Sequence, residues 1–108
     1  MHEIKEPDWK VLRRLHPLAL ERFCERVLAE VEQVIENKSG SAHERYLNIY
    51  GILGRRDRDI ACLFNDLKRP RGLTMVAGIR SERLLPEEEF SGLSPEARSI
   101  IKMLLSDN

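Results

Sequence analysis

The sequence lacks the features that mark several large classes of protein. It has two cysteines, Cys24 and Cys62, with no CxxC or other metal-like spacing, and aromatic residues make up only 6% of the chain. No window approaches the 18 or more apolar residues of a membrane-spanning helix, and the first ten residues lack the apolar run of a signal peptide. We therefore expect a reduced cytoplasmic protein with no membrane association.

An excess of charge of one sign is also missing, because 18 basic side chains balance 18 acidic ones. A nucleic-acid-binding protein usually carries a net positive field, so the overall charge does not favour that class. The charge is uneven, however, since residues 41–80 contain eight basic and four acidic side chains. The basic residues that cluster there are Arg55, Arg56, Arg58, Lys68, Arg69 and Arg71. We keep nucleic-acid or anion binding through this basic cluster as an alternative function.

Catalytic and cofactor motifs are absent as well. The chain has no HExxH, no P-loop, no GxGxxG and no GxSxG, and no stretch resembles a known family closely enough to name. We predict no cofactor, no metal and no enzymatic activity. The remaining catalytic possibility, a second alternative, is a pocket beside Asp57, Tyr50 and His43.

The sequence is rich in residues that form amphipathic helices. Apolar residues make up 42% and charged residues 33%, with Leu, Glu, Arg and Ala prominent, and 108 residues fit one domain. We predict a single compact all-α domain over residues 1–108, a bundle of five or six helices in which two longer central helices pack antiparallel. Residues 1–7 are expected to form a flexible leader, and residues 106–108 are expected to fray.

Helix boundaries follow from prolines and capping residues. Asp8 can begin a helix that Pro17 ends, and a second helix then runs to residue 37 with a heptad-like apolar stripe. Ser41 and Glu44 match a capping box at the start of the central helix. Residues 73–79 are the one strand candidate, but they do not alternate in polarity, so we predict a helix. Ser94 is expected to cap the last helix.

The predicted central helix, residues 41–69, contains one anomaly. At helical spacing Asp57 lies on the same side as Tyr50, Leu53 and Phe64, which predicts a buried carboxylate. Asp57 can pair with an arginine or a tyrosine hydroxyl, it can cap a second helix after a break at Gly54, or it can belong to a functional pocket. We favour the first, a buried polar site formed by Asp57 and Tyr50.

The apolar faces are extensive for so short a chain. Leu47 and Ile52 lie off the main stripe of the central helix, where a single core would not cover them. We therefore expect a protein-interaction or assembly module, with a homodimer as its simplest form. Leu47, Ile52 and the basic cluster are the candidate interaction surface.

Overall fold

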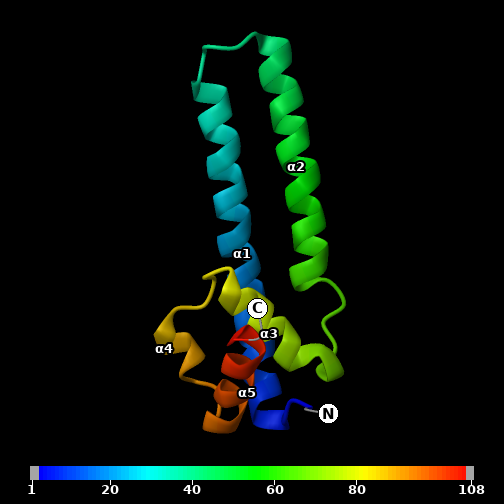
Figure 1. Cartoon of the computed structure of the whole chain (residues 1–108), viewed down its shortest axis with the longest axis vertical. Helices are drawn as coiled ribbons and strands as arrows, with labels where there is room; N and C mark the ends of the chain where they lie inside the picture. The colour runs from blue at the N-terminus through cyan, green and yellow to red at the C-terminus, as the bar shows by residue number, and fades with distance from the viewer. Residues whose placement is uncertain (1–2, 107–108) are drawn as a thin grey trace.

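The all-α prediction is confirmed by a computed structural model, which describes residues 3–106 (Figure 1). The helices of this part of the chain are α1 (Glu6–Glu36), α2 (Ala42–Phe64), the 3₁₀ turn η1 (Arg69–Arg71), α3 (Gly72–Ser81), α4 (Glu87–Phe90) and α5 (Pro95–Ser106). The two long helices α1 and α2 pack antiparallel, as predicted. Residues 73–79, the strand candidate, belong to α3 and are helical.

The molecule has two parts with different degrees of packing. Residues 3–23 and 65–106 form what we call the head, in which α3, α4 and α5 surround the start of α1. Residues 24–64 form a helical hairpin that projects from the head and gives the molecule dimensions of 52 × 25 × 24 Å (Figure 1). Only three hairpin residues, Val27, Ile52 and Phe64, are buried. The core therefore lies almost entirely in the head.

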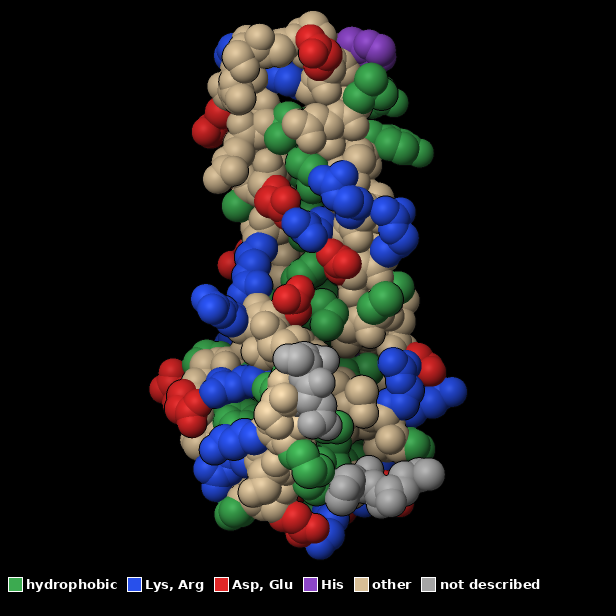
Figure 2. Space-filling view, viewed as in Figure 1, with side chains coloured by type: hydrophobic (Ala, Val, Ile, Leu, Met, Phe, Trp, Pro, Cys, Tyr) green, Lys and Arg blue, Asp and Glu red, His purple; other side chains and the backbone are tan. Residues whose placement is uncertain are grey.

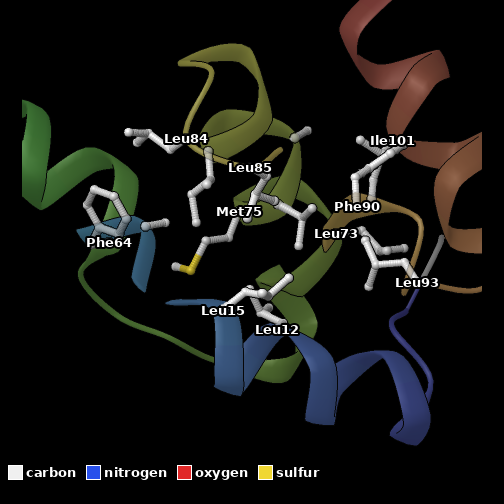
Figure 3. Close-up of a cluster of buried hydrophobic side chains, with 14 of the residues drawn as sticks. Leu12, Leu15, Phe64, Leu73, Met75, Leu84, Leu85, Phe90, Leu93 and Ile101 are labelled. Carbon is white, nitrogen blue, oxygen red and sulfur yellow. The ribbon is translucent and has the colours of Figure 1, made fainter. Parts of the chain in front are cut away.

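The core of the head joins segments from both ends of the sequence (Figure 3). Phe90 and Ile101 from the C-terminal segments pack with Leu12 of α1 and with Ile79 and Val76 of α3, and all five are fully buried. Because α4 and α5 are only 4 and 12 residues long, they have little stability of their own. Packing against α1 and α3 is what holds them in place.

The predicted break at Pro17 is wrong, because α1 runs without interruption through this proline. The buried positions Leu12, Leu15, Ala19 and Phe23 keep one helical stripe on both sides of it. Pro17 itself is exposed, so its ring lies away from the core. Burial of the stripe outweighs the missing hydrogen bond, which costs about 3 kcal/mol in a helix interior.

Pro17→Ala should consequently raise the free energy of unfolding, by about 1–3 kcal/mol. The alanine supplies a backbone N–H that can donate to the carbonyl of Arg13, while the loss of proline's rigidity in the unfolded chain returns less than about 1 kcal/mol. Urea unfolding followed by circular dichroism measures the change. An unchanged or lowered stability would show that the helix near Pro17 does not gain the hydrogen bond.

The flexible leader is also wrong for the described residues from Ile4 onward. Ile4 is buried against Gly72, where an added Cβ would lie 2.8 Å from Ile4 Cγ2, and its carbonyl accepts a hydrogen bond from Arg69 Nε at 3.1 Å. Residues 1–2 and 107–108 lie outside the described part of the chain, so the expectations for them stay predictions. The start of the chain is thus part of the head.

A buried carboxylate joins the first helix to the last one. Asp8 of α1 accepts hydrogen bonds from the Ser94 backbone N–H at 2.8 Å and from the Ser94 hydroxyl at 2.6 Å. The same hydroxyl accepts from the Ala97 N–H at 3.1 Å, which confirms Ser94 as the cap of α5. Asp8 therefore fixes where α5 begins relative to α1.

Arginines of α1 hold the connection between α3 and α4. Arg22 donates to both carboxylate oxygens of Glu89 at 2.7 Å and to the Leu84 carbonyl at 2.9 Å. The hydrogen bond from Arg22 lowers the pKa of the Glu89 carboxyl. Arg26 donates to the carbonyls of Glu82 and Arg83. These bonds satisfy backbone oxygens of a connection whose Arg83 has a positive φ of 59°.

Candidate interaction surface

The start of α2 is set by the predicted capping box. Ser41 accepts from the Glu44 N–H at 3.0 Å, and Glu44 accepts from the Ser41 N–H at 3.0 Å, so both expected bonds are present. The hydrogen bond that the Ser41 backbone N–H donates to the Glu44 carboxylate is the main cause that lowers the pKa of this carboxyl. The short turn before Ser41 leaves α1 and α2 side by side for most of the length of α2 (Figure 1).

Large hydrophobic side chains remain exposed along one side of this hairpin. Five residues, which we call the apolar face, are between 47% and 71% exposed: Leu28 and Ile35 of α1, and Tyr46, Tyr50 and Leu53 of α2. Leu28 and Ile35 are seven residues apart, and the three α2 residues are spaced by four and three. Such spacing places the residues of each helix in one row.

The two rows belong to a single surface. Ile35 of α1 lines a shallow hollow of about 280 Å³ together with Tyr46 and Ile49 of α2. Half-buried Val31 lies between Leu28 and Ile35, and half-buried Ile49 lies between Tyr46 and Leu53. The apolar face therefore crosses from one helix to the other instead of forming two separate stripes.

The other side of the hairpin is ionic. Arg56 donates to Glu30 of α1 at 2.7 Å and to Asp59 at 2.9 Å, and Figure 2 shows acidic and basic side chains next to each other along the near side of the hairpin. Hydrogen bonding to Arg56 lowers the pKa of the Glu30 carboxyl, and the bonds to Glu30 and Asp59 raise the pKa of Arg56. Because Leu28 is two residues from Glu30, about 200° around the helix, the apolar face points away from this ionic side.

The predicted buried polar site is wrong. Asp57 is exposed, Tyr50 is 71% exposed, and neither is part of the core. α2 is continuous from Ala42 to Phe64, so there is no break at Gly54 either. The side of α2 that contacts α1 includes Ile52 and Arg56. Because Arg56 is charged and forms ion pairs, this side is less apolar in sequence than the side with the tyrosines. The stripe of α2 that was predicted to be buried faces away from α1.

The two apolar candidates from the sequence have different locations. Leu47 is about half exposed on α2, three residues before Tyr50 of the apolar face. Ile52 is only 6% exposed and packs inside the hairpin, so its assignment to an accessible surface is wrong. Leu28 and Ile35, on the apolar side of the N-terminal helix, were not predicted from the sequence to be surface residues. The apolar side of this helix is wider than a single neighbouring helix can cover. That width is the sequence signal that part of the side stays exposed.

The basic cluster does not form one continuous patch. Arg55, Arg56 and Arg58 lie on the hairpin, whereas Lys68, Arg69 and Arg71 lie in the connection that enters the head. Four of the six make ion pairs: Arg56 with Glu30 and Asp59, Lys68 and Arg71 with Asp66, and Arg69 with Glu6. These carboxylates compete with any phosphate for the same guanidinium and ammonium groups.

Two hollows in the described part of the chain lie away from the residues of the catalytic possibility. Hollows of about 480 and 500 Å³ open on the ionic side of the hairpin and beside Arg22 in the head, and neither is lined by Asp57, Tyr50 or His43. His43 is exposed and stacks on Tyr46, with ring centroids 6.5 Å apart. Over residues 3–106, no group of three or more His, Cys, Asp or Glu side chains is placed to hold a metal ion.

Comparison with protein-family models, with curated proteins and with solved structures gave no match to this chain. Within residues 3–106, no helix has both the length and the apolar character needed to cross a bilayer.

Proposed function

We propose that the protein is a protein-interaction module whose docking surface is the apolar face of the hairpin. The observation that carries this proposal is the contrast between the two parts of the molecule. Among the described residues, the head exposes two large hydrophobic side chains, Leu18 and Met103, whereas the shorter hairpin exposes six, five of which lie on one side. Contiguous apolar surface of this kind on a folded protein usually marks a contact site.

The composition of the face fits a contact site. Tyr46 and Tyr50 present large rings with few rotatable bonds, and tyrosine is enriched at interfaces because its ring packs while its hydroxyl keeps a hydrogen bond. Leu28, Ile35 and Leu53 add aliphatic surface beside them. Charged residues of the ionic side occupy the opposite surface and would keep the hairpin soluble.

Nucleic-acid binding receives less support. Arg56 and Arg69 already bind carboxylates at 2.7–2.9 Å, and the exposed tyrosines lie on the other side of the hairpin from the Arg56 pairs. A single-strand-binding surface needs unpaired cations beside exposed aromatic rings. On this molecule the ion pairs of Arg56 and the exposed tyrosine rings lie on different sides of the hairpin.

Site-specific cross-linking tests the proposed function. The photoreactive residue p-benzoylphenylalanine is placed at Tyr50, on the apolar face, and the full chain is irradiated in the cells that express it. We expect a covalent adduct with a protein, because a docked partner covers this position. Asn48 is the matched control, since it is exposed two residues away and lies 200° around the helix. Absence of any adduct at Tyr50, or equal yields at both positions, would contradict the proposal.

A further inference from the structure

Exposed residues of the two helices lie at matching distances from two central residues, Val31 and Leu53; one of these exposed residues, Asp57, lies beside the apolar face and is not part of it. On α1, Leu28 and Ile35 lie three residues before and four after Val31. On α2, Tyr50 and Asp57 lie three residues before and four after Leu53, which is the middle residue of the helix Ala42–Phe64. The Glu30–Arg56 pair shows that Val31 and Leu53 are at similar heights along the hairpin, within about one helical turn.

We propose that the partner is a second copy of this chain, packed face to face and antiparallel about a two-fold axis that passes near Val31 and Leu53. This inference rests on the proposed function and specifies its partner. A two-fold axis across the hairpin reverses the height of every residue in the second copy. With the axis half a residue beyond Val31 and Leu53, a residue three places before either of them meets one four places after it in the other copy.

The residues that meet under this axis are chemically matched. On α1, Leu28 of each copy meets Ile35 of the other, which covers apolar surface with apolar surface. On α2, Leu53 meets its own symmetry mate. Tyr50 meets Asp57, whose exposed carboxylate can accept a hydrogen bond from the phenol of the other copy. Asp57 thus gains a partner between copies that the single chain does not provide.

The lengths of the helices agree with this arrangement. Ser41 and Asn65, the two caps of α2, each lie 12 residues from Leu53. The tip of one hairpin then reaches the level at which the head of the other copy begins, and the hairpins overlap along their full length. Glu32 is exposed in the single chain and also lies close to the axis, so its carboxylate approaches its symmetry mate, a like-charge contact that opposes the dimer.

The surface is large enough for a dimer. With about 200 Å² for a full tyrosine side chain, the two tyrosines expose about 250 Å², and the three aliphatic side chains bring the apolar face to about 500–600 Å². Half-buried Val31, Ile49 and Ile60 and the polar rim bring the contact close to the roughly 800 Å² per partner of a standard interface. The result is a four-helix arrangement in which each hairpin supplies two helices.

A cysteine at the centre of α2 tests both the dimer and its direction. Leu53→Cys is made in the full chain with Cys24→Ala and Cys62→Ser, and the protein is oxidised mildly. We expect a disulfide-linked dimer, because only position 53 of α2 lies next to its own symmetry mate. Leu47→Cys is the control, since it is similarly exposed but its mate lies about 20 Å away along the axis of the helix. Light scattering of the unmodified chain is expected to give a dimer mass, and Leu53→Asp to weaken dimerisation at least about tenfold with the helix content unchanged.

Other outcomes would overturn the proposal in distinguishable ways. A monomer mass at about 200 μM, a concentration at which even a weak dimer forms, would rule out self-association. An adduct with a different protein at Tyr50 would then still support the proposed function, whereas no adduct would remove both. A dimer in which the Leu53→Cys variant does not cross-link, or cross-links no better than the Leu47→Cys variant, would exclude the antiparallel arrangement.

Discussion

Phe90→Ala is expected to lower the free energy of unfolding by about 3–5 kcal/mol, the range typical of a large aromatic removed from a core. Phe90 is 2% exposed, and the Arg80 guanidinium lies 4.3 Å above its ring. The substitution leaves a cavity in the core of the head and also removes the cation–π contact. Urea denaturation followed by circular dichroism at a fixed protein concentration measures the loss.

Leu47→Ala is the matched control for this measurement. It also shortens a large apolar side chain in a helical protein, but Leu47 is about half exposed and lies in the hairpin. Its expected change is within about 0.5 kcal/mol, as for surface substitutions in general. A Phe90→Ala loss no larger than that of Leu47→Ala would mean that the C-terminal helices do not form the core described above.

Asp8→Ala is expected to cost about 2–4 kcal/mol. Asp8 is 6% exposed, and its loss leaves the Ser94 N–H and hydroxyl without their acceptor at the start of α5. A buried donor that loses a charged partner incurs its full desolvation penalty. Asp8→Asn should cost less, because an amide oxygen can still accept the bond from the Ser94 N–H.

A double-mutant cycle with Ser94→Ala isolates the contact between the two residues. Because the Asp8 carboxylate and the Ser94 hydroxyl are 2.6 Å apart, the double variant should lose clearly less than the sum of the single losses. Strictly additive losses would indicate that Asp8 stabilises the head by some other route. The same unfolding assay supplies all the values.

Local signals in the sequence predicted local structure well. The Ser41–Glu44 capping box and the Ser94 cap depend on residues three positions apart, and both are present. Pro17 shows the limit of such signals, because the stripe from Leu12 to Phe23 is buried against residues more than 40 positions away and overrides the local preference of proline. Local propensity gives way where tertiary packing is strong.

Which side of a helix becomes buried depends on the helices that pack against it. The row with Tyr50 and Leu53 is more apolar than the side of α2 that contacts α1, so the pattern alone favoured the wrong side as the core. The Glu30–Arg56 contact joins residues 26 positions apart, and no spacing rule within α2 reveals it. The anomaly at Asp57 arose from that reversal, and the exposed carboxylate has no desolvation penalty in the single chain.

The long sequence separation between Asp8 and Ser94 bears on the order in which the two parts of the molecule fold. These two residues are 86 positions apart, whereas the hairpin closes through a turn of only a few residues between α1 and α2. Short loops close faster than long ones, so the hairpin can form while the head still waits for the last helix. On a ribosome, where the N-terminal part emerges first, the apolar face would be available to a neighbouring nascent chain before the head is complete. For the dimer that we propose, this order of folding predicts assembly that begins during synthesis.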